Sequence, residues 1–187
     1  MTPISDWDAR YAAGEYTPSK EPNKLLVELL PILPKGRALD IACGEGRNAI
    51  FLAKNGYDVD AVDISGVAIK RGEETAKEGG MNVNFIQADM EKYEIPIDNY
   101  NLITNFNYLQ RTLVPGIKKG LKKGGAVVFE TFTLEQQAIG SPRNPEFLLK
   151  PNELLRLFEG LHIFFYREGI FEDGRKKAIA SLVGKRL

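Results

Sequence analysis

The amino-acid sequence predicts an α/β fold: a doubly wound, mostly parallel seven-stranded sheet that ends in an antiparallel hairpin and carries helices on both faces. Two observations predict the parallel part. Apolar runs of strand length alternate with amphipathic segments, and glycines stand at the junctions. Such alternation requires right-handed crossovers, which make the strands parallel. The third observation is the end of the chain, where Glu172-Asp173-Gly174-Arg175 separates two β-rich segments and is a hairpin turn signal.

The chain before the first strand divides into an aromatic segment, 1–22, and a helix, 23–33. Trp7 and Tyr11 share one face if the first part is helical, and Tyr16 follows them. These rings either cover the edge of the core or belong to a lid. Asn23 is a suitable N-cap for the helix. We therefore expect a lid of residues 1–22 and a single domain of residues 23–187.

The remaining elements follow in order. Strands are expected at 37–43, 57–63, 83–88, 101–106 and 126–133, and the hairpin strands at 161–171 and 176–187. Helices are expected at 46–55, 65–78 and 111–121. Ser65 is the expected cap of the second of these. Pro151 should open a last helix, which runs to about Phe158, at a position where its missing N–H costs nothing.

The charge balance argues against large anionic partners. The 25 lysines and arginines cancel the 25 aspartates and glutamates, so no net positive field would hold a nucleic acid or an anionic membrane. The N-terminus does not resemble a signal peptide, and no apolar run has the length of a membrane span, which favours a cytoplasmic protein. The single cysteine excludes an internal disulfide, and no residue spacing suggests a metal site.

The stretch "ALDIACGEGRN" (38–48) indicates a nucleotide site, because an apolar strand turns through Gly44-Glu45-Gly46 into a helix. Two further acids follow the next strands. Asp63 stands 19 residues after Gly44, at a position suited to accept ribose hydroxyls. Asp89 ends the third strand, where it would either accept from an adenine amine or cap the following turn.

The acid Asp40 discriminates between two cofactor classes. A pyrophosphate would be repelled by a carboxylate beside the turn, whereas the ammonium and sulfonium of S-adenosylmethionine (SAM) would be attracted by it. This argues for SAM over a nicotinamide dinucleotide. The alternative for Asp40 is a purely structural hydrogen bond to the turn.

These residues carry a resemblance to a known family. "ALDIACGEGRN", "VDAVDIS" and "QADME" resemble the first three motifs of the Rossmann-type, class I SAM-dependent methyltransferases, and the terminal hairpin is similar to the strand pair that closes their sheet. "GRNAIFLAKNGYDVDAVDIS" and "WDARY" resemble the tellurite-resistance and thiopurine methyltransferase-like branch. One departure is Ala42, which replaces a usual glycine.

The resemblance implies a role for particular positions. The implied cofactor residues are Asp40, Ala42, Gly44, Gly46 and Asn48 at the first motif, Asp63 and Ile64 at the second, Asp89 and Met90 at the third, and Asn105 near the methyl donor. The implied cofactor is SAM and the product S-adenosyl-L-homocysteine (SAH). The implied enzyme is a methyltransferase that acts by in-line displacement on a small-molecule acceptor.

The sequence offers no evident general base. His162 lies in the wrong part of the chain, and Cys43 is expected to pack at a strand end rather than react. A thiolate, a metalloid oxyanion or another small nucleophile is therefore the favoured acceptor. The candidates for its pocket are Trp7, Tyr11, Tyr16, Tyr108, Arg111, Arg143 and Lys150. Each cation among them is equally well explained as a solvated loop residue.

Two alternatives remain at this point. One is a SAM-binding module without catalysis, because methyl transfer needs no obligatory catalytic side chain. The other is a nicotinamide-dependent oxidoreductase, which Asp40 and the terminal hairpin disfavour. The expected oligomeric state is a monomer or a homodimer.

Overall fold

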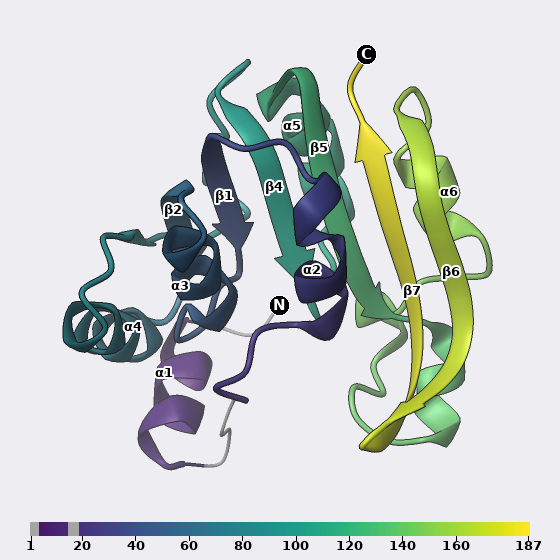
Figure 1. The fold of residues 1–187 in the computed structure, drawn as a ribbon. Coiled ribbons are helices and arrows are strands. Elements are labelled where there is room, and N and C mark those ends of the chain that lie inside the picture. Colours follow the sequence, from purple (N-terminus) through teal and green to yellow (C-terminus); the bar gives the residue numbers. More distant parts are fainter. Residues whose placement is uncertain (1–3, 15–18) are drawn as a thin grey trace.

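The computed structural model describes residues 4–14 and 19–187, and among these the side chains of residues 4–6 and 173 are left out of the description. The sheet has seven strands in the order β3-β2-β1-β4-β5-β7-β6 (Figure 1). The strands are β1 (Arg37–Ile41), β2 (Asp58–Asp63), β3 (Asn84–Gln87), β4 (Tyr100–Phe106), β5 (Leu121–Phe132), β6 (His162–Asp173) and β7 (Arg175–Lys185). The first five are parallel, and β7 is antiparallel to both β5 and β6. The predicted fold class is confirmed.

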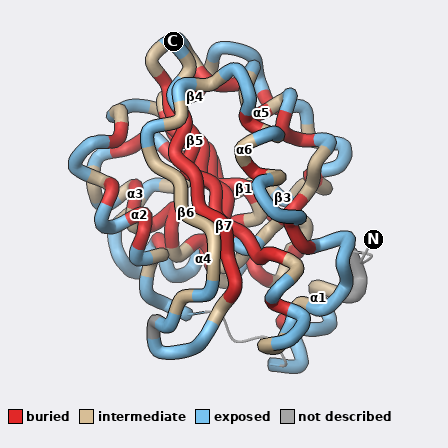
Figure 2. Tube along the Cα trace, turned by 90° about the vertical axis from the view of Figure 1, so that its right-hand side faces the viewer, coloured by how far each residue is buried: buried red, intermediate tan, exposed pale blue. Residues whose placement is uncertain are grey.

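Helices cover both faces of the sheet. The helices are α1 (Ile4–Ala12), α2 (Lys24–Leu29), α3 (Arg47–Lys54), α4 (Gly66–Glu78), α5 (Val114–Gly120) and α6 (Glu153–Leu157). Residues of α2, α3 and α4 share one hydrophobic cluster with one face of the sheet, and residues of α5 and α6 share another with the opposite face. The inner strands β1, β2, β4, β5 and β7 are accordingly mostly buried, whereas the edge strands β3 and β6 are partly exposed (Figure 2). Among the described residues, no helix has the length and apolarity to cross a membrane.

Two predicted helix caps are present in the structure. The side chain of Asn23 accepts a hydrogen bond from the amide of Leu25 at the start of α2. The hydroxyl of Ser65 accepts one from the amide of Ala68 at the start of α4. Because these caps satisfy amides that have no partner inside the helix, they fix where each helix begins.

Several predicted boundaries are wrong, and proline and glycine explain most of the differences. The helix expected at 23–33 is α-helical only to Leu29 and continues as a 3₁₀ turn, Leu30–Ile32, that contains Pro31. Pro151 does not begin α6. The N-cap of this helix is Asn152, at φ 57°, which separates Pro151 from the first helical residue. The helix expected at 111–121 begins as a 3₁₀ turn, Arg111–Leu113. Strand β5 begins five residues earlier than predicted, at Leu121.

Candidate active site at the carboxyl edge of the sheet

The predicted cofactor residues gather at one edge of the sheet, because parallel strands bring their carboxyl ends together. The turn after β1 and the end of β2 touch directly: the amide of Gly44 donates to Oδ2 of Asp63 at 2.7 Å. The other oxygen of Asp63 accepts from the amide of Ser65 at 2.9 Å. Burial raises the pKa of Asp63, and these two amide hydrogen bonds oppose the rise. Each carboxylate oxygen has a second lone-pair site, so ribose hydroxyls can still be accepted.

The turn after β1 needs residues that tolerate a left-handed backbone. Gly44 and Gly46 have φ values of 58° and 76°, and Ala42 has φ 51°, which glycine adopts with less strain. The glycines are also sterically required. A Cβ at Gly44 would lie 2.8 Å from the Tyr11 hydroxyl, and a Cβ at Gly46 would lie 2.6 Å from the ring of Phe85.

Asp40 is the most informative group at this edge. It is 1% exposed, and its Oδ1 accepts from the Thr104 hydroxyl of β4 at 2.8 Å. Its Oδ2 is buried and has no hydrogen-bond partner among the described residues. Burial raises the pKa of Asp40 to about 7. Burial removes the water that would stabilise the charged form of a carboxylate. A cationic ligand beside the unpaired oxygen would supply that stabilisation, so the carboxylate fits a cationic ligand. These residues therefore fit SAM.

Other predicted cofactor residues serve the architecture of the site in this structure. Asn48 is buried, and its Oδ1 accepts from the amide of Asn23 at 2.8 Å. Asn105 is buried, and its Nδ2 donates to the carbonyl of Tyr108 at 2.8 Å, which shapes the loop after β4. Asp89 caps the turn that follows it through the amide of Glu91, at 3.0 Å, as one of its two predicted roles required.

The remaining two predicted cofactor residues are Met90 and Ile64. Met90 is 4% exposed and packs into the core cluster that contains α5. It also lines a hollow of about 620 Å³ between the 90–97 loop and α5. Ile64 is half-buried, and its carbonyl accepts from the side chain of Gln87 at 3.3 Å.

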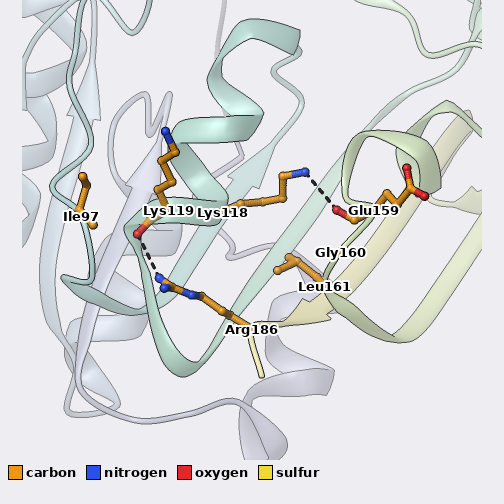
Figure 3. Close-up of a pocket in the computed structure, with 7 residues that line it drawn as sticks. All are labelled: Ile97, Lys118, Lys119, Glu159, Gly160, Leu161 and Arg186. Atoms are coloured by element: carbon orange, nitrogen blue, oxygen red, sulfur yellow. Dashed lines mark hydrogen bonds between the residues drawn. The ribbon is translucent and has the colours of Figure 1, made fainter.

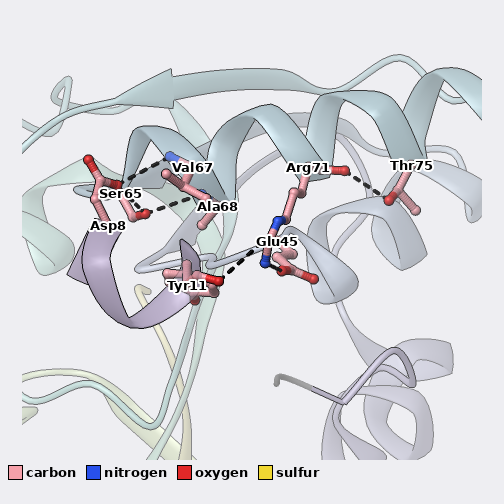
Figure 4. A network of polar contacts seen from close by, with 8 residues as sticks. All are labelled: Asp8, Tyr11, Glu45, Ser65, Val67, Ala68, Arg71 and Thr75. Atoms are coloured by element: carbon pink, nitrogen blue, oxygen red, sulfur yellow. Dashed lines mark hydrogen bonds and ion pairs between the residues drawn. The ribbon is translucent and has the colours of Figure 1, made fainter. Parts of the chain in front are cut away.

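Helix α1 lies against the cofactor edge (Figure 4). Asp8 accepts from the Ser65 hydroxyl at 2.6 Å and from the amide of Val67 at 3.2 Å, so it joins α1 to the start of α4. Arg71 of α4 donates to the carbonyl of Tyr11 and to Glu45, both at 3.1 Å. The rings of Trp7 and Tyr11 are 6.2 Å apart, as their predicted common face requires.

The predicted acceptor-pocket residues differ in their burial and in their hydrogen-bond partners. Arg111 forms a bidentate ion pair with Glu153 and donates to two carbonyls, so protein groups engage it. The hydroxyl of Tyr108 donates to Gln110, and burial raises its pKa. Arg143 and Lys150 are exposed. Tyr16 lies outside the described residues.

A buried acid that the sequence analysis did not single out is Glu130, near the carboxyl end of β5. It is 5% exposed and accepts from Asn23 at 2.9 Å, from Ser181 at 2.6 Å and from Arg167 at 3.2 Å. It thereby connects the start of α2 to the hairpin. The signal in the sequence is a lone acid inside the apolar strand "AVVFETF".

The two most reactive residue types do not serve as nucleophile or base here. Cys43 is buried, and burial raises the pKa of its thiol well above the ordinary value, which disfavours the thiolate. His162 begins β6, which runs parallel to β5, so it lies at the opposite edge of the sheet. Among the described residues, no group of three or more His, Cys, Asp or Glu side chains could hold a metal ion.

A second hollow, of about 360 Å³, lies at that opposite edge (Figure 3). The Lys118 ammonium donates there to the carbonyls of Leu157 and Glu159, at 3.2 and 3.1 Å. Arg186 donates to the carbonyl of Lys119 at 3.3 Å. These cations therefore bond carbonyls near the ends of α5 and α6, and the hollow shares Ile97 and Lys119 with the hollow that Met90 lines.

Comparison with known proteins gives a family match and several relatives that are methyltransferases. The family model of a methyltransferase domain matches residues 38–125. The probable S-adenosyl-L-methionine-dependent methyltransferase TehB of Haemophilus influenzae is 27% identical over 153 residues, 79% of this chain and 53% of TehB. The probable thiol methyltransferase 2 of Arabidopsis thaliana is 26% identical over 150 residues, 73% of this chain and 65% of that protein. The chain spans about half the length of several curated relatives that it matches.

Two solved structures share the fold. The crystal structure of TehB from Haemophilus influenzae has a TM-score of 0.79 at 21% identity, over 96% of this chain and 66% of TehB. The geranyl diphosphate C-methyltransferase of Streptomyces coelicolor, crystallised with Mg²⁺, geranyl diphosphate and SAH, has a TM-score of 0.68 at 16% identity, over 87% of this chain and 80% of that one.

Proposed function

We propose that this chain, a class I SAM-dependent methyltransferase by its family match and its fold, transfers the methyl group of SAM to a small-molecule acceptor. The resemblance drawn from the three motifs, and SAM as the cofactor, are confirmed by the comparisons. The identity of the acceptor is the part that we propose. The observation that carries the assignment to a cationic cofactor is the buried, unpaired oxygen of Asp40 beside the glycine turn.

The residues at the carboxyl edge would hold the cofactor in three parts. The turn from Ala42 to Gly46 would bind the methionine part, with Asp40 compensating its positive charge. Asp63 would accept the ribose hydroxyls, and Ile64 and Met90 would flank the adenine. When bound, SAM supplies a methyl group on a sulfonium, which already carries its leaving group. The protein's task is then to orient the acceptor and to exclude water.

The acceptor that we favour is a thiol or another soft, small nucleophile. A thiol loses its proton at lower pH than an alcohol does, and its thiolate is strongly nucleophilic, so it depends less on a strong base; no His or Cys at the carboxyl edge is placed to act as one among the described residues. The carboxyl end of β5 offers polar groups on this side. The hydroxyls of Thr131 and Thr133 are buried and have no hydrogen-bond partner among the described residues. The similarity to a probable thiol methyltransferase supports this choice.

The N-terminal segment would act as a cover for the cofactor. Helix α1 contacts the start of α4, next to Asp63, and Arg71 of α4 bonds both Tyr11 of α1 and Glu45 of the glycine turn. The Tyr11 hydroxyl lies over Gly44, where the methionine part would bind. Release of α1 would therefore be needed for SAM to enter and SAH to leave. This proposal concerns the described residues of the segment only.

The experiment is a calorimetric titration with SAM, SAH and NADH, followed by turnover assays with thiols, tellurite, selenite and small carboxylic acids. We expect SAM and SAH to bind and a thiol to be methylated. Binding of NADH without SAM would contradict the assignment. Binding of SAM without turnover of any acceptor would favour a module that binds SAM without catalysis.

A further inference from the structure

The 146–150 segment extends the sheet beyond the carboxyl end of β4. The amide of Leu149 donates to the carbonyl of Phe132 at 2.9 Å, and the amide of Leu134 donates to the carbonyl of Leu149 at 3.0 Å. Thr133 and Leu149 form an isolated parallel bridge. Because the amide of Thr133 points the other way, to Ala178 of β7, the segment lies on the β4 side of β5.

This position faces the site where methyl transfer would occur. The last pair between β4 and β5 is Phe106 with Glu130, and Asn105 precedes it. Beyond this pair, the 146–150 segment takes the place of β4 beside the end of β5. It therefore forms a wall on the acceptor side of the methyl donor, opposite the cofactor turn after β1.

The side chain of Arg111, which begins the 3₁₀ turn after the β4 loop, bonds two carbonyls of the segment. Its guanidinium donates to the carbonyl of Glu146 at 2.8 Å and to the carbonyl of Leu148 at 2.9 Å. It also pairs with both oxygens of Glu153, at 2.7 and 3.0 Å. These contacts use four hydrogen bonds, and a guanidinium has five N–H donors.

Glu153, the ion-pair partner of Arg111, is a second contact of the segment. The Glu153 side chain is 14% exposed and also accepts from the amide of Lys150 at 2.8 Å. The hydrogen bond from Arg111 lowers the pKa of Glu153. Bidentate pairs between arginine and a carboxylate define orientation as well as distance, which a lysine does not reproduce. Leu148 and Leu149, the two leucines of the segment, are fully buried.

We infer that Arg111 is a positioning residue for the methyl acceptor: it couples the loop after β4 to the 146–150 segment and so sets the distance between the methyl donor and the acceptor-side wall. The inference rests on the proposed function. It also changes the interpretation of Arg111, because the side chain acts on the wall rather than on an anionic substrate. A misplacement of about 1 Å can cost a factor of about 100 in rate, so the effect on turnover is measurable.

The test compares Arg111→Gln and Arg111→Lys with Arg156→Gln in the full chain. Arg156 is the matched control, because it is an exposed arginine of α6 whose single bonded carbonyl, of Pro151, lies outside the segment. The first readout is amide exchange at Leu148 and Leu149, which requires no acceptor. The second is steady-state kinetics with 2-mercaptoethanol and with thiophenol. The third is the Kd of SAM.

We expect Arg111→Gln to speed exchange at both leucines and to lower kcat for the thiols by about ten- to a hundredfold, with the Kd of SAM within twofold of the original. Arg111→Lys should restore only part of the loss, and Arg156→Gln should match the original protein. Unchanged exchange at Leu148 and Leu149, or faster exchange with unchanged thiol kinetics, would overturn the inference. If the unmodified protein binds SAM but methylates neither thiol, the proposed acceptor class fails, and unchanged exchange would still overturn the role of Arg111.

Discussion

Gly44 and Asp63 are joined by a 2.7 Å hydrogen bond from the glycine amide to the carboxylate, although they belong to different strand ends. The bond fixes the turn that would hold the methionine part of SAM relative to the acid that would hold its ribose. The two cofactor contacts are therefore set by one interaction.

The first prediction follows from this bond. Asp63→Ala removes the acceptor of two backbone amides and of the proposed ribose hydroxyls. We expect the Kd of SAM to rise by roughly ten- to a hundredfold, because hydrogen bonds to a charged group contribute about 1.5–3 kcal/mol. Calorimetry measures the Kd, and circular dichroism checks that the fold persists. An unchanged Kd would show that Asp63 does not contact the cofactor.

The second prediction concerns stability and the ionisation of Asp40. Its folded-state pKa of about 7 is above the ordinary value of 3.8, so the folded state holds this proton more tightly than the unfolded state does. The stabilisation is complete below about pH 4 and is lost as the pH rises towards 7. Without SAM, Asp40→Asn should therefore be more stable than the original at pH 8, by on the order of 2 kcal/mol, in urea unfolding. Equal stabilities at pH 8 would contradict this sign.

The same group should act in the opposite direction on SAM binding. A cationic ligand favours the ionised carboxylate, so SAM affinity should increase as the pH rises through about 7. Asp40→Asn should lose this increase and bind SAM more weakly at pH 8, while the two proteins converge at pH 5.5. The variant also leaves the nearby Asp63 and Arg47 in place, so the difference isolates Asp40. Parallel pH profiles for both proteins would exclude the role.

A third prediction tests the cover formed by α1. Arg71→Gln removes the donor that joins α4 to Tyr11 and Glu45. We expect SAH to dissociate faster, by about tenfold if about 1.4 kcal/mol is lost, in stopped-flow fluorescence. The exposed residue Glu74 of the same helix gives the control Glu74→Gln, which should not change the rate. Identical rates of SAH dissociation in both variants would show that α1 has no part in cofactor exchange.

A fourth prediction concerns the steric limit at Gly46. In Gly46→Ala, the new Cβ meets the Phe85 ring and the backbone keeps φ 76°. Overpacking of this kind typically costs about 1–3 kcal/mol, so the variant should unfold at lower urea and bind SAM poorly. Adding Phe85→Ala should remove the clash and leave the backbone strain, so the double variant should regain SAM affinity only in part. Full recovery of SAM affinity would mean that the Phe85 ring, and not backbone strain, is the reason that position 46 requires glycine.

The last prediction addresses Cys43. Burial disfavours its thiolate, so a disulfide reagent such as DTNB should label the folded protein slowly and the urea-unfolded protein rapidly. Cys43→Ala should retain methyl transfer. Rapid labelling in the folded state, or loss of turnover in the variant, would restore the cysteine as a reactive candidate.

The sequence was sufficient for those features that depend on local periodicity. The strand order along the chain, the caps at Asn23 and Ser65 and the glycine turn all follow from residues close in the sequence. The network of Glu130 and the partners of Arg111 did not follow, because each joins residues 35 or more positions apart. Asn48 shows the same limit: its position at the first motif was evident, but its bond to Asn23 depends on how α2 packs.

The placement of β7 in the interior of the sheet, between β5 and β6, bears on how the molecule is assembled during synthesis. The five parallel strands, which carry the proposed cofactor residues, are all translated before β6. Strand β6, in contrast, has no neighbour in the sheet until β7 is inserted between it and β5. β6 and β7 form a local hairpin, but the pairing of β7 with β5 closes a long loop, and such pairing is intrinsically slow. The parallel half, where we propose that the nucleoside binds, can therefore form early, whereas Glu130 gains its contacts to Arg167 and Ser181 only after the final strand has been translated.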